Sequence, residues 1–518
     1  MPVLHPRPLA HAASLSGPGC PARSGKARPA HRRLCARNHP QPTPDEPARR
    51  GRTSLKWGWR TCSLPIPLLH RPCRCLASTY TVPVRRHARN AHVELLKSAL
   101  RECLARSRQQ LRRIGGSERE LARLTVRHVA SGSRGLPVVL CDTSEVTPDD
   151  GLFVRGRPIA EAASRTPEEL FWLLLTGDWP DAQQAAELGR ELACRCRLPD
   201  YLWRVLEALP ADTHPMAQLN TGVLALQPNS IFARRYAAGL PPDRFWEATL
   251  EDALNLLAQL PCLAGYIYRR RTRKGAISCC EARRDWAGGY AHMLGLPDPH
   301  GRLAAALRLL CVVHGDHGGG NVSSLAAAVV NSSLADIYLA LSAGLNGLAG
   351  PLDGLASQES VYWLRQVAAS DAGPDANVWR RAVDERLAAR RPIPGFGHAV
   401  LRCVDPRYRI LADFARRECP EAPLVRAALA AAEHVPALLR EKTRTRNPNP
   451  NVDLISGPLM DAFGIAEPEY HAVLISVGRA LGLCAQAVLA RGLGLPIFRP
   501  DSITLQRLAA GTDAGTQA

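Results

Sequence analysis

The side chains best suited to chemistry gather in five segments in the second half of the chain. These segments are 314–321, 349–359, 394–407, 450–453 and 478–502. An aspartate such as Asp453 has an intrinsic pKa near 3.9 and becomes an effective base only when it is desolvated or crowded by other negative charge. Arginines such as Arg407 bind carboxylates through a planar fork and stay charged. These residue types can transfer protons and hold anionic ligands.

Small and turn-forming residues surround two of these segments. Gly395 and Gly397 let the backbone approach a ligand closely. The turn-forming segment 447–451 immediately precedes Asp453 and could pin its carboxylate. Without other information, an Asx turn or a helix cap would account for the same residues.

Two metal sites and a phosphate loop are the alternative interpretations of these patterns. His314, Asp316 and His317 are metal-ligand types, but no further ligand stands near them in the sequence. Residues 318–321 lack the GxxxxGK[ST] pattern and a preceding strand, so they do not predict a phosphate loop. A zinc site at Cys194 and Cys196 has no second ligand pair at a finger-like spacing. We therefore expect no metal.

The five segments together resemble mitochondrial-type citrate synthases, in the same order and at matching separations, over about residues 93–508. The resemblance implies an acyltransferase that condenses acetyl-CoA with oxaloacetate to give citrate and CoA. It also implies acetyl-CoA as a co-substrate with no tightly bound cofactor. The protein would be a homodimer with shared active sites that close by domain rotation.

The resemblance also implies roles for individual residues. Asp453 stands at the position of the catalytic base, and His398 at that of the histidine that polarises the oxaloacetate ketone. The dicarboxylate would be held by His317, Arg407, Arg479 and Arg499, of which Arg499 would reach the partner's site. The residues expected to contact CoA are Arg134, Gly395, Gly397 and Arg402.

Asp353 departs from the family pattern, because the synthases carry a catalytic histidine there that donates to the enolate oxygen of acetyl-CoA. An ionised Asp is only an acceptor and adds negative charge beside that oxygen. Losing one such donor typically costs about 2.7–4 kcal/mol, or roughly 10²–10³ in rate. A protonated Asp353 beside Asp453 could still donate. Gly318 is a second departure, where the family commonly has Glu.

Three functions stay open on these grounds. The first is a citrate synthase, working or weakened by Asp353. The second is a catalytically inactive, ligand-binding, dimeric paralogue. The third is citryl-CoA cleavage, because citryl-CoA lyase domains resemble this chain and can carry Leu-Asp at the equivalent place.

The basic charge of the chain belongs to its first 92 residues. Of the 66 Lys and Arg residues and 47 acids, this segment holds 17 and two, giving a net charge of +15 there against +4 for the rest. It also carries 14 of the 42 prolines. An Arg-rich, acid-poor start predicts a mitochondrial transit segment, and a disordered extension is the alternative. Aromatic residues are not interleaved with the charge, so we expect no nucleic-acid partner.

The compartment follows from the cysteines and the apolar segments. Five of the 16 cysteines lie in the leader, and the others form no regular framework, which indicates reduced thiols. No stretch of 18 or more apolar residues lacks a charge, so we expect no membrane span. With the leader, these features predict the mitochondrial matrix.

The sequence predicts a mostly α protein with one hairpin. The hairpin would pair 136–140 with 152–156 across a turn at 148–151. Apolar periodicity predicts helices over 93–111, 167–176, 182–196, 201–209, 244–260, 302–313, 322–330, 335–345, 359–368 and 473–490.

The resemblance implies a citrate synthase-like fold, in which a small helical domain is inserted into a large helical domain. We place the small domain at 354–458 and the large domain at 93–353 plus 459–511, with a flexible tail at 512–518. Gly350, Gly354, Gly395 and Gly457 lie near the crossings, where small residues could absorb backbone rotation.

Overall fold

The computed structural model describes residues 91–275, 284–369 and 376–513. The predicted leader, residues 1–92, lies outside these ranges except for its last two residues. Most of the predicted tail, residues 512–518, lies outside them as well. The described residues all fall in one compact unit of the chain.

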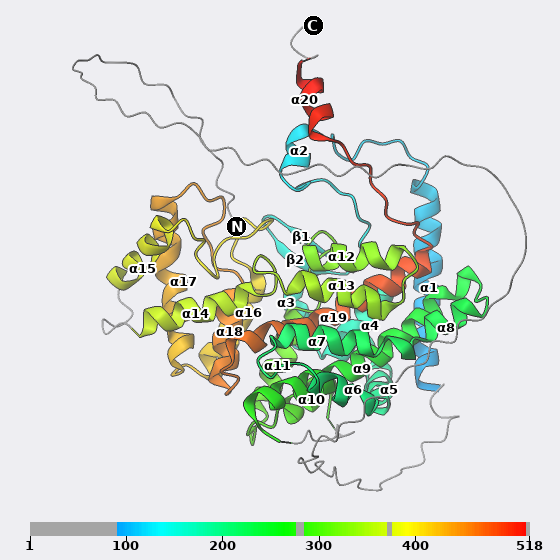
Figure 1. Ribbon diagram of the computed structural model, residues 1–518, viewed down its shortest axis with the longest axis horizontal. Helices are drawn as coiled ribbons and strands as arrows, with labels where there is room; N and C mark the ends of the chain where they lie inside the picture. The colour runs from blue at the N-terminus through cyan, green and yellow to red at the C-terminus, as the bar shows by residue number, and fades with distance from the viewer. Residues whose placement is uncertain (1–90, 276–283, 370–375, 514–518) are drawn as a thin grey trace, which may run out of the picture. The chain divides into compact units, whose positions relative to one another are not determined.

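Helices make up most of the described chain, which confirms the predicted fold class (Figure 1). The first ten helices are α1 (Ala91–Ile114), α2 (Val126–Ala130), α3 (Ile159–Ala162), α4 (Pro167–Thr176), α5 (Ala182–Arg195), α6 (Tyr201–Glu207), α7 (Pro215–Ala225), α8 (Ile231–Ala237), α9 (Phe245–Thr272) and α10 (Trp286–Leu294). The other ten are α11 (Arg302–Val313), α12 (Val322–Ser332), α13 (Ile337–Leu348), α14 (Ala356–Ala368), α15 (Ala376–Ala388), α16 (Pro406–Glu418), α17 (Pro423–Lys442), α18 (Asp453–Ala462), α19 (Pro468–Leu493) and α20 (Leu505–Asp513). Two 3₁₀ turns, η1 (Gln227–Asn229) and η2 (Pro242–Arg244), accompany the strands β1 (Ser144–Thr147), β2 (Gly151–Val154) and β3 (Arg157–Pro158).

Helix α4 shows why some bounds could be predicted to the residue. Thr166 caps the helix by accepting the N–H of Glu169 at 3.3 Å, and Glu169 accepts the N–H of Thr166 at 2.8 Å. This reciprocal capping box satisfies donors that the first turn leaves free. At the other end, Gly177 adopts φ 89°, a left-handed conformation that favours glycine and ends helices.

Helix α9 runs twelve residues beyond its predicted end at residue 260, because Pro261 does not stop it. Proline removes one backbone donor and so leaves the carbonyl four residues earlier unpaired. Here that carbonyl belongs to Leu257, and it accepts the indole N–H of Trp286 at 2.7 Å. A tertiary contact therefore satisfies the group that the proline frees, and it docks α10 on α9.

The predicted first strand of the hairpin, residues 136–140, is wrong. The residue pairs of β1 and β2 are antiparallel, and Thr147 faces Gly151 directly across the turn. Because the turn is short, the first strand of the hairpin must end directly before the turn. Residues 136–140 end well before that point. Pro137 also lacks the N–H that a paired strand needs. The second strand and the turn are placed as predicted, with β2 ending two residues earlier.

Helix α19 forms the centre of the core. It packs against several helices, among them α4, α7, α9, α11 and α13 (Figure 1). By length and composition it is the one described helix that could cross a membrane, yet nearly all of it is buried inside the protein. A helix that is apolar on all sides and enclosed by other helices is a core helix.

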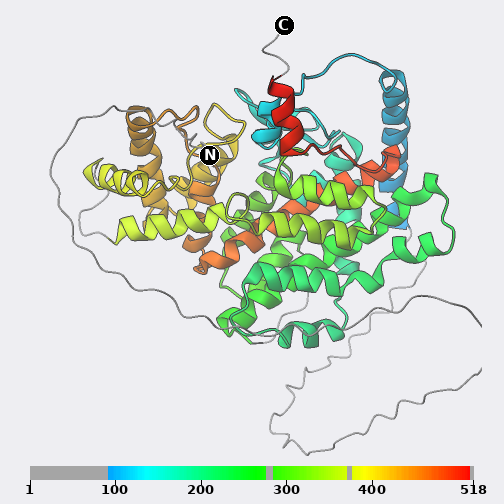
Figure 2. The ribbon, with the colours of Figure 1, turned by 45° about the horizontal axis from the view of Figure 1, so that its top comes forward.

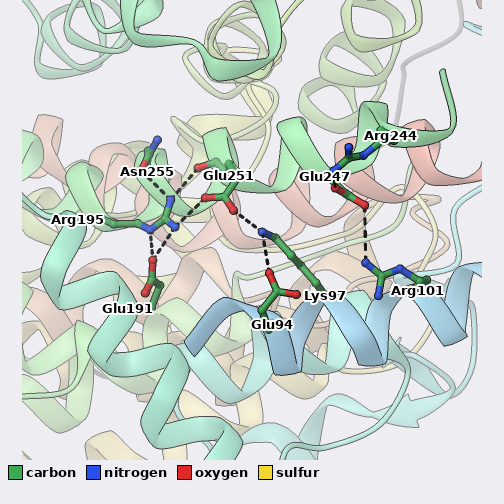
Figure 3. A network of polar contacts seen from close by, with 9 residues as sticks. All are labelled: Glu94, Lys97, Arg101, Glu191, Arg195, Arg244, Glu247, Glu251 and Asn255. Carbon is green, nitrogen blue, oxygen red and sulfur yellow. Dashed lines mark hydrogen bonds and ion pairs between the residues drawn. The ribbon is translucent and has the colours of Figure 1, made fainter. Parts of the chain in front are cut away.

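A network of charged side chains fastens α1 to α5 and α9 (Figure 3). Glu251 lies at its centre, 2.7 Å from Lys97 and 2.7 Å from Arg195. Arg195 also pairs with Glu191 and donates to Asn255 at 2.9 Å. Burial alone would raise the pKa of Glu251, but Arg195 and Lys97 outweigh it and lower that pKa.

Helices α14 to α18 pack chiefly on one another, and both ribbon views show them as a group (Figures 1 and 2). Within the group, α18 contacts α14, α16 and α17. It also contacts α11 and α19, which belong to the rest of the fold. Helix α18 therefore lies where the two sets of helices meet.

Candidate active site

The Gly-rich loop before α16 is held against the segment before α18 by backbone hydrogen bonds. The N–H of Gly397 donates to the carbonyl of Asn449 at 3.0 Å, and the N–H of Asn451 donates to the carbonyl of Gly395 at 2.9 Å. Gly395 and Gly397 have φ of 77° and 81°, a region that favours glycine. A Cβ at Gly395 would lie 2.8 Å from the Cβ of Leu454, so close packing also requires glycine there.

Asn451 connects this loop to the first residue of α18, Asp453. Its side-chain oxygen accepts the N–H of Asp453 at 3.0 Å. Its side-chain N–H donates to the carbonyl of Gly397 at 2.8 Å. The segment before Asp453 thus fixes the backbone that carries the carboxylate.

The surroundings of Asp453 favour its protonated form. Burial raises its pKa to about 7. The negative charges of Asp405 and Asp353 add to this increase, while Arg407 and Arg479 oppose it. Asp453 is therefore a stronger base than an ordinary aspartate and still ionises near neutral pH.

His398 is a neutral hydrogen-bond donor in this site. Its Nδ1 accepts the backbone N–H groups of Val400 at 3.0 Å and Leu401 at 2.9 Å. In the neutral ring the proton must then sit on Nε2, which leaves that N–H available. Burial, helped by the charge of Arg407, lowers the pKa of His398 to about 4.

His317 lies next to His398, with ring centroids 5.3 Å apart at an interplanar angle of 63°. Burial first, and then Arg407 and His398, lower its pKa well below the usual value. Its Nε2 has no hydrogen-bond partner among the residues that the structure describes. A buried polar nitrogen of this kind is available to a ligand.

Arg407 is buried in a two-point ion pair with Asp405. Their nitrogen–oxygen distances are 2.7 Å for Nη2 and 3.0 Å for Nε. Asp405 also caps α16 and accepts the N–H of Val452 at 3.2 Å. Burial would raise the pKa of Asp405, but Arg407 outweighs burial and lowers it. No role was predicted for Asp405, although Asp before Pro is a signal for a helix cap.

Arg479, on α19, is the second buried guanidinium of the site. Its Nε–H donates to the carbonyl of His314 at 2.9 Å. Burial lowers its pKa, and Asp353 is the strongest of the negative charges that oppose this. Arg479 and Asp353 therefore lie within electrostatic reach of each other.

Asp353 lies in the turn between α13 and α14. Its carboxylate accepts the backbone N–H of Ser323, in the first turn of α12, at 3.2 Å. Helix N-termini carry a partial positive charge that favours anions. The side chain thus acts as an acceptor here, and its charge contributes to the raised pKa of Asp453.

The structure brings together six of the predicted site residues. They are His317, Asp353, His398, Arg407, Asp453 and Arg479, which are linked by ring contact or mutual electrostatic influence. Together they supply two buried cations, two neutral imidazoles and a carboxylate that ionises near pH 7. They come from α16, α18, α19 and the loops before α12, α14 and α16.

Of the other predicted arginines, Arg134 and Arg499 lie outside this group, whereas Arg402 adjoins it and donates to the carbonyl of His398 at 3.4 Å. Arg134 and Arg499 are exposed on irregular segments. Arg402 is partly buried and donates to carbonyl groups of its own loop, among them that of Leu401 at 2.8 Å. Its backbone N–H donates to Pro148 in the hairpin turn at 2.7 Å.

No group of three or more His, Cys, Asp or Glu side chains is arranged to hold a metal ion within the described ranges. His314 illustrates why the sequence pattern misleads. Its Nδ1 faces the carbonyl of Leu310 at 3.1 Å, so this nitrogen is a donor.

Two buried arginines beside a carboxylate of raised pKa suit proton transfer next to an anionic ligand. The family model described as "Citrate synthase, C-terminal domain" matches residues 132–501. The chain belongs to the citrate synthase family and is a citrate synthase-like acyltransferase.

Relatives and solved structures agree with this assignment. "Citrate synthase, mitochondrial" of Citrus maxima is 39% identical over 424 residues, which is 79% of this chain and 89% of the relative. "Citrate synthase 4, mitochondrial" of Arabidopsis thaliana is 39% identical over 429 residues, 80% and 90% of the two chains. The citrate synthase of Pyrobaculum aerophilum has a TM-score of 0.64 at 26% identity, over 72% of this chain and 92% of that one.

A further solved structure shares the fold. It is the citrate synthase of Thermoplasma acidophilum in a ternary complex with carboxymethyl coenzyme A and oxaloacetate. It has a TM-score of 0.64 at 18% identity and covers 73% of this chain and 96% of that one.

Proposed function

We propose that the chain condenses acetyl-CoA with oxaloacetate to give citrate and CoA, at a rate weakened by Asp353. The observation that carries this proposal is the raised pKa of Asp453, about 7, beside two buried arginines. A base with that pKa, next to cations that can hold a dicarboxylate, suits proton abstraction from a thioester methyl group.

The proposed first step is proton removal by Asp453. The carboxylate takes a methyl proton of acetyl-CoA and leaves an enolate. The Nε2–H of His398 donates to the oxaloacetate ketone and stabilises the alkoxide as the new carbon–carbon bond forms. Hydrolysis of the citryl thioester then releases CoA and citrate.

The substrate carboxylates would be held by Arg407 and Arg479, with the free Nε2 of His317 nearby. Asp405 keeps Arg407 oriented through two hydrogen bonds. A guanidinium fixed in this way binds a carboxylate without first paying the entropy of ordering its side chain.

Asp353 is the residue that we expect to lower the turnover of the proposed enzyme. An ionised carboxylate only accepts hydrogen bonds, as Asp353 does from Ser323, so in that form it offers no donor to the enolate oxygen. Its charge also opposes negative charge developing nearby. We expect turnover to be about 10²–10³ below that of an enzyme with a donor at this place.

Acetyl-CoA is the proposed co-substrate, with no tightly bound cofactor. Arg134, Gly395, Gly397 and Arg402 are the proposed CoA contacts. The carboxymethyl coenzyme A in the Thermoplasma acidophilum complex supports a CoA site in this fold. The left-handed glycines 395 and 397 support close backbone approach in this chain.

We also propose a homodimer whose subunits share their active sites. Large apolar side chains are exposed along α12, α13 and the connection between them. They are Val322, Val329, Leu334 and Leu339. Burying such a face against a second copy would stabilise a dimer. It would also let the exposed Arg499 serve the partner's site.

The proposed domain division places 354–458 as a small domain inside a large domain of 93–353 and 459–511. The mutual packing of α14 to α18 supports it. Closure of the two around substrate would need rotation near Gly350, Gly354, Gly395 and Gly457. The mitochondrial names of the relatives and the basic leader support a location in the mitochondrial matrix.

The second candidate is an inactive, ligand-binding paralogue, which the hydrogen bond between Asp353 and Ser323 favours. Citryl-CoA cleavage is the third outcome that an assay must separate. The test has two assays of the purified full-length protein: release of free thiol from acetyl-CoA plus oxaloacetate, and separately formation of oxaloacetate from citryl-CoA. Asp453→Asn is the matched control.

The outcomes distinguish the three functions. Thiol release from acetyl-CoA and oxaloacetate that Asp453→Asn abolishes supports the proposal. No release by the natural chain, with oxaloacetate still bound, supports the inactive paralogue. Formation of acetyl-CoA and oxaloacetate from citryl-CoA, without synthesis, supports cleavage.

A further inference from the structure

Three residues on one face of α19 hold the loop that carries His317. They are Arg479, Gly482 and Gln486, spaced by three and four residues, which places them on the same side of a helix. Arg479 donates to the carbonyl of His314 at 2.9 Å. The N–H of Gly482 donates to the carbonyl of Gly315 at 2.9 Å.

The third contact passes through Asp316, which the proposed function leaves without a role. The side-chain N–H of Gln486 donates to Asp316 Oδ1 at 2.7 Å. The same oxygen accepts the backbone N–H of His317 at 3.0 Å. One carboxylate oxygen therefore bridges α19 to the residue that presents a free imidazole nitrogen to the site.

The fit around this bridge is tight. Asp316 is 1% exposed, and a Cβ at position 482 would lie 2.5 Å from its Oδ1. On the far side of the loop, Ser144 of β1 accepts the N–H of Gly318 at 2.7 Å. The loop is thus held from both α19 and β1.

We infer that Asp316 and Gln486 are positioning residues for the carboxylate-binding group: they set the placement of His317 relative to Arg479. This inference rests on the proposed function for the identity of the ligand, oxaloacetate. The geometry gives the reason, since Arg479 and Gln486 act on the same loop from the same helix face. Loss of the bridge lets His317 move independently of Arg479.

Asp316 Oδ1 accepts two N–H groups, so the bridge needs an oxygen acceptor at this place. Burial raises the pKa of this carboxyl, so its surroundings disfavour the charged form. Asp316→Asn keeps an oxygen acceptor and removes the charge, whereas Asp316→Leu removes both. The inference therefore orders the variants: Asp316→Leu and Gln486→Met weaken oxaloacetate binding strongly, and Asp316→Asn weakens it less.

The matched control is Gln259→Met. Gln259 makes a hydrogen bond of similar length, 3.0 Å, to the carbonyl of Arg197, between α9 and the end of α5. The same chemical change is made there, outside the group of site residues. A general loss of stability from removing one glutamine contact would appear in both variants.

The experiment measures two properties of the full-length protein and its variants. The first is the Kd for oxaloacetate and for CoA by calorimetry. We expect Gln486→Met to raise the Kd for oxaloacetate by about tenfold to a hundredfold, since misplacement by about 1 Å has effects of this size. The Kd for CoA and both constants of Gln259→Met stay unchanged.

The second property is the rate at which diethyl pyrocarbonate modifies His317, followed by peptide mass spectrometry. We expect a change of about threefold or more in Gln486→Met and none in Gln259→Met. This readout needs neither turnover nor oxaloacetate. If the natural chain binds no oxaloacetate, the proposed function fails while the modification rate still decides the inference.

Unchanged modification of His317 in folded Gln486→Met, with an unchanged Kd for oxaloacetate where binding occurs, would overturn the inference. Should Gln486→Met fail to fold, Gln486→Asn takes its place, because it keeps the amide and withdraws it by one methylene.

Discussion

The carboxylate of Asp353 accepts the backbone N–H of Ser323 at 3.2 Å, in the first turn of α12. A histidine at the same place would offer a donor to the site, whereas this aspartate directs an acceptor to a helix terminus. The substitution therefore has two consequences, one for catalysis and one for helix stability.

Asp353→His is predicted to raise thiol release from acetyl-CoA and oxaloacetate by about 10²–10³. It also removes an anion from the N-terminus of α12, which costs about 0.3–1 kcal/mol in the free energy of unfolding. Steady-state kinetics and urea unfolding measure the two effects. A variant that folds, binds oxaloacetate and turns over no faster than the natural chain contradicts this prediction.

The pH dependence of kcat/KM is predicted to follow Asp453. Because its pKa is raised to about 7 and the base acts in its ionised form, the rate rises as pH increases through about 7. Asp353→Asn removes one of the charges that raise this pKa, so the rise moves to lower pH. Asp461→Asn, at the other end of α18, leaves it in place. If kcat/KM rises at the same pH in Asp353→Asn as in the natural chain, the titrating group is not Asp453.

Asp453→Asn is predicted to lower turnover by about 10²–10⁴ and to stabilise the fold at pH 8. A carboxyl whose folded pKa is raised contributes stability at low pH, and this is lost as pH rises from its unfolded value through about 7. The neutral amide avoids that loss. Urea unfolding should show a gain of about 4 kcal/mol at pH 8 and about 1.5 kcal/mol at pH 5. Equal changes at both pH values would rule out the raised pKa.

Asp405→Asn is predicted to destabilise the protein by about 3–5 kcal/mol, because it leaves Arg407 buried without its counter-ion. The matched control is Asp413→Asn, also on α16, whose 2.7 Å pair with Arg416 is exposed. That change should cost less than about 1 kcal/mol. Similar losses for the two variants would contradict the account.

The ion pair of Asp405 also predicts a sensitivity to acid. Its folded pKa is lowered, so its contribution to stability is present above about pH 4 and is lost as pH falls through the folded value. The difference in unfolding free energy between the natural chain and Asp405→Asn should therefore narrow on acidification below about pH 4.

The network of Figure 3 predicts a stability effect far from the site. Glu251→Gln loses the charge that pairs with both Lys97 and Arg195, and should cost about 1–2 kcal/mol. Glu247→Gln is the control, since its partners Arg101 and Arg244 are largely exposed. The unfolding free energy of Glu247→Gln should change little. If Glu247→Gln lowered the free energy of unfolding as much as Glu251→Gln, burial would not determine the strength of these ion pairs.

Local sequence signals predicted a helix correctly where contacts within that helix set its bounds. The capping box at Thr166 and Glu169 and the glycine after it fix α4 to the residue. In α9, Pro261 is a local stop signal that a distant indole, that of Trp286, overrides. The first strand of the hairpin was predicted at the wrong residues. Apolar residues at 136–140 favour a strand locally, but the position of the turn determines which residues pair across a hairpin.

The residues of the candidate site likewise include some that the sequence could identify and others that only the folded structure reveals. Motif residues such as Asp453, His398 and Arg407 could be named from the sequence because their types are suited to acid–base and anion chemistry. Gln486 could not be found, because its importance depends on contact with Asp316, 170 residues earlier. The tautomer of His398 likewise follows from backbone donors that only the folded loop supplies.

The proposed function requires that the buried arginines Arg407 and Arg479 hold a small dicarboxylate beside Asp453. Calorimetric titration of oxaloacetate into the full-length protein and into Arg479→Met tests it most directly. Arg491→Met is the control, because Arg491 is a buried arginine of the same helix that donates to Ala335 at 2.7 Å, away from the site. We predict binding by the natural chain and by Arg491→Met, and a loss of affinity of about a hundredfold or more in Arg479→Met. Equal affinity in all three proteins would contradict the account.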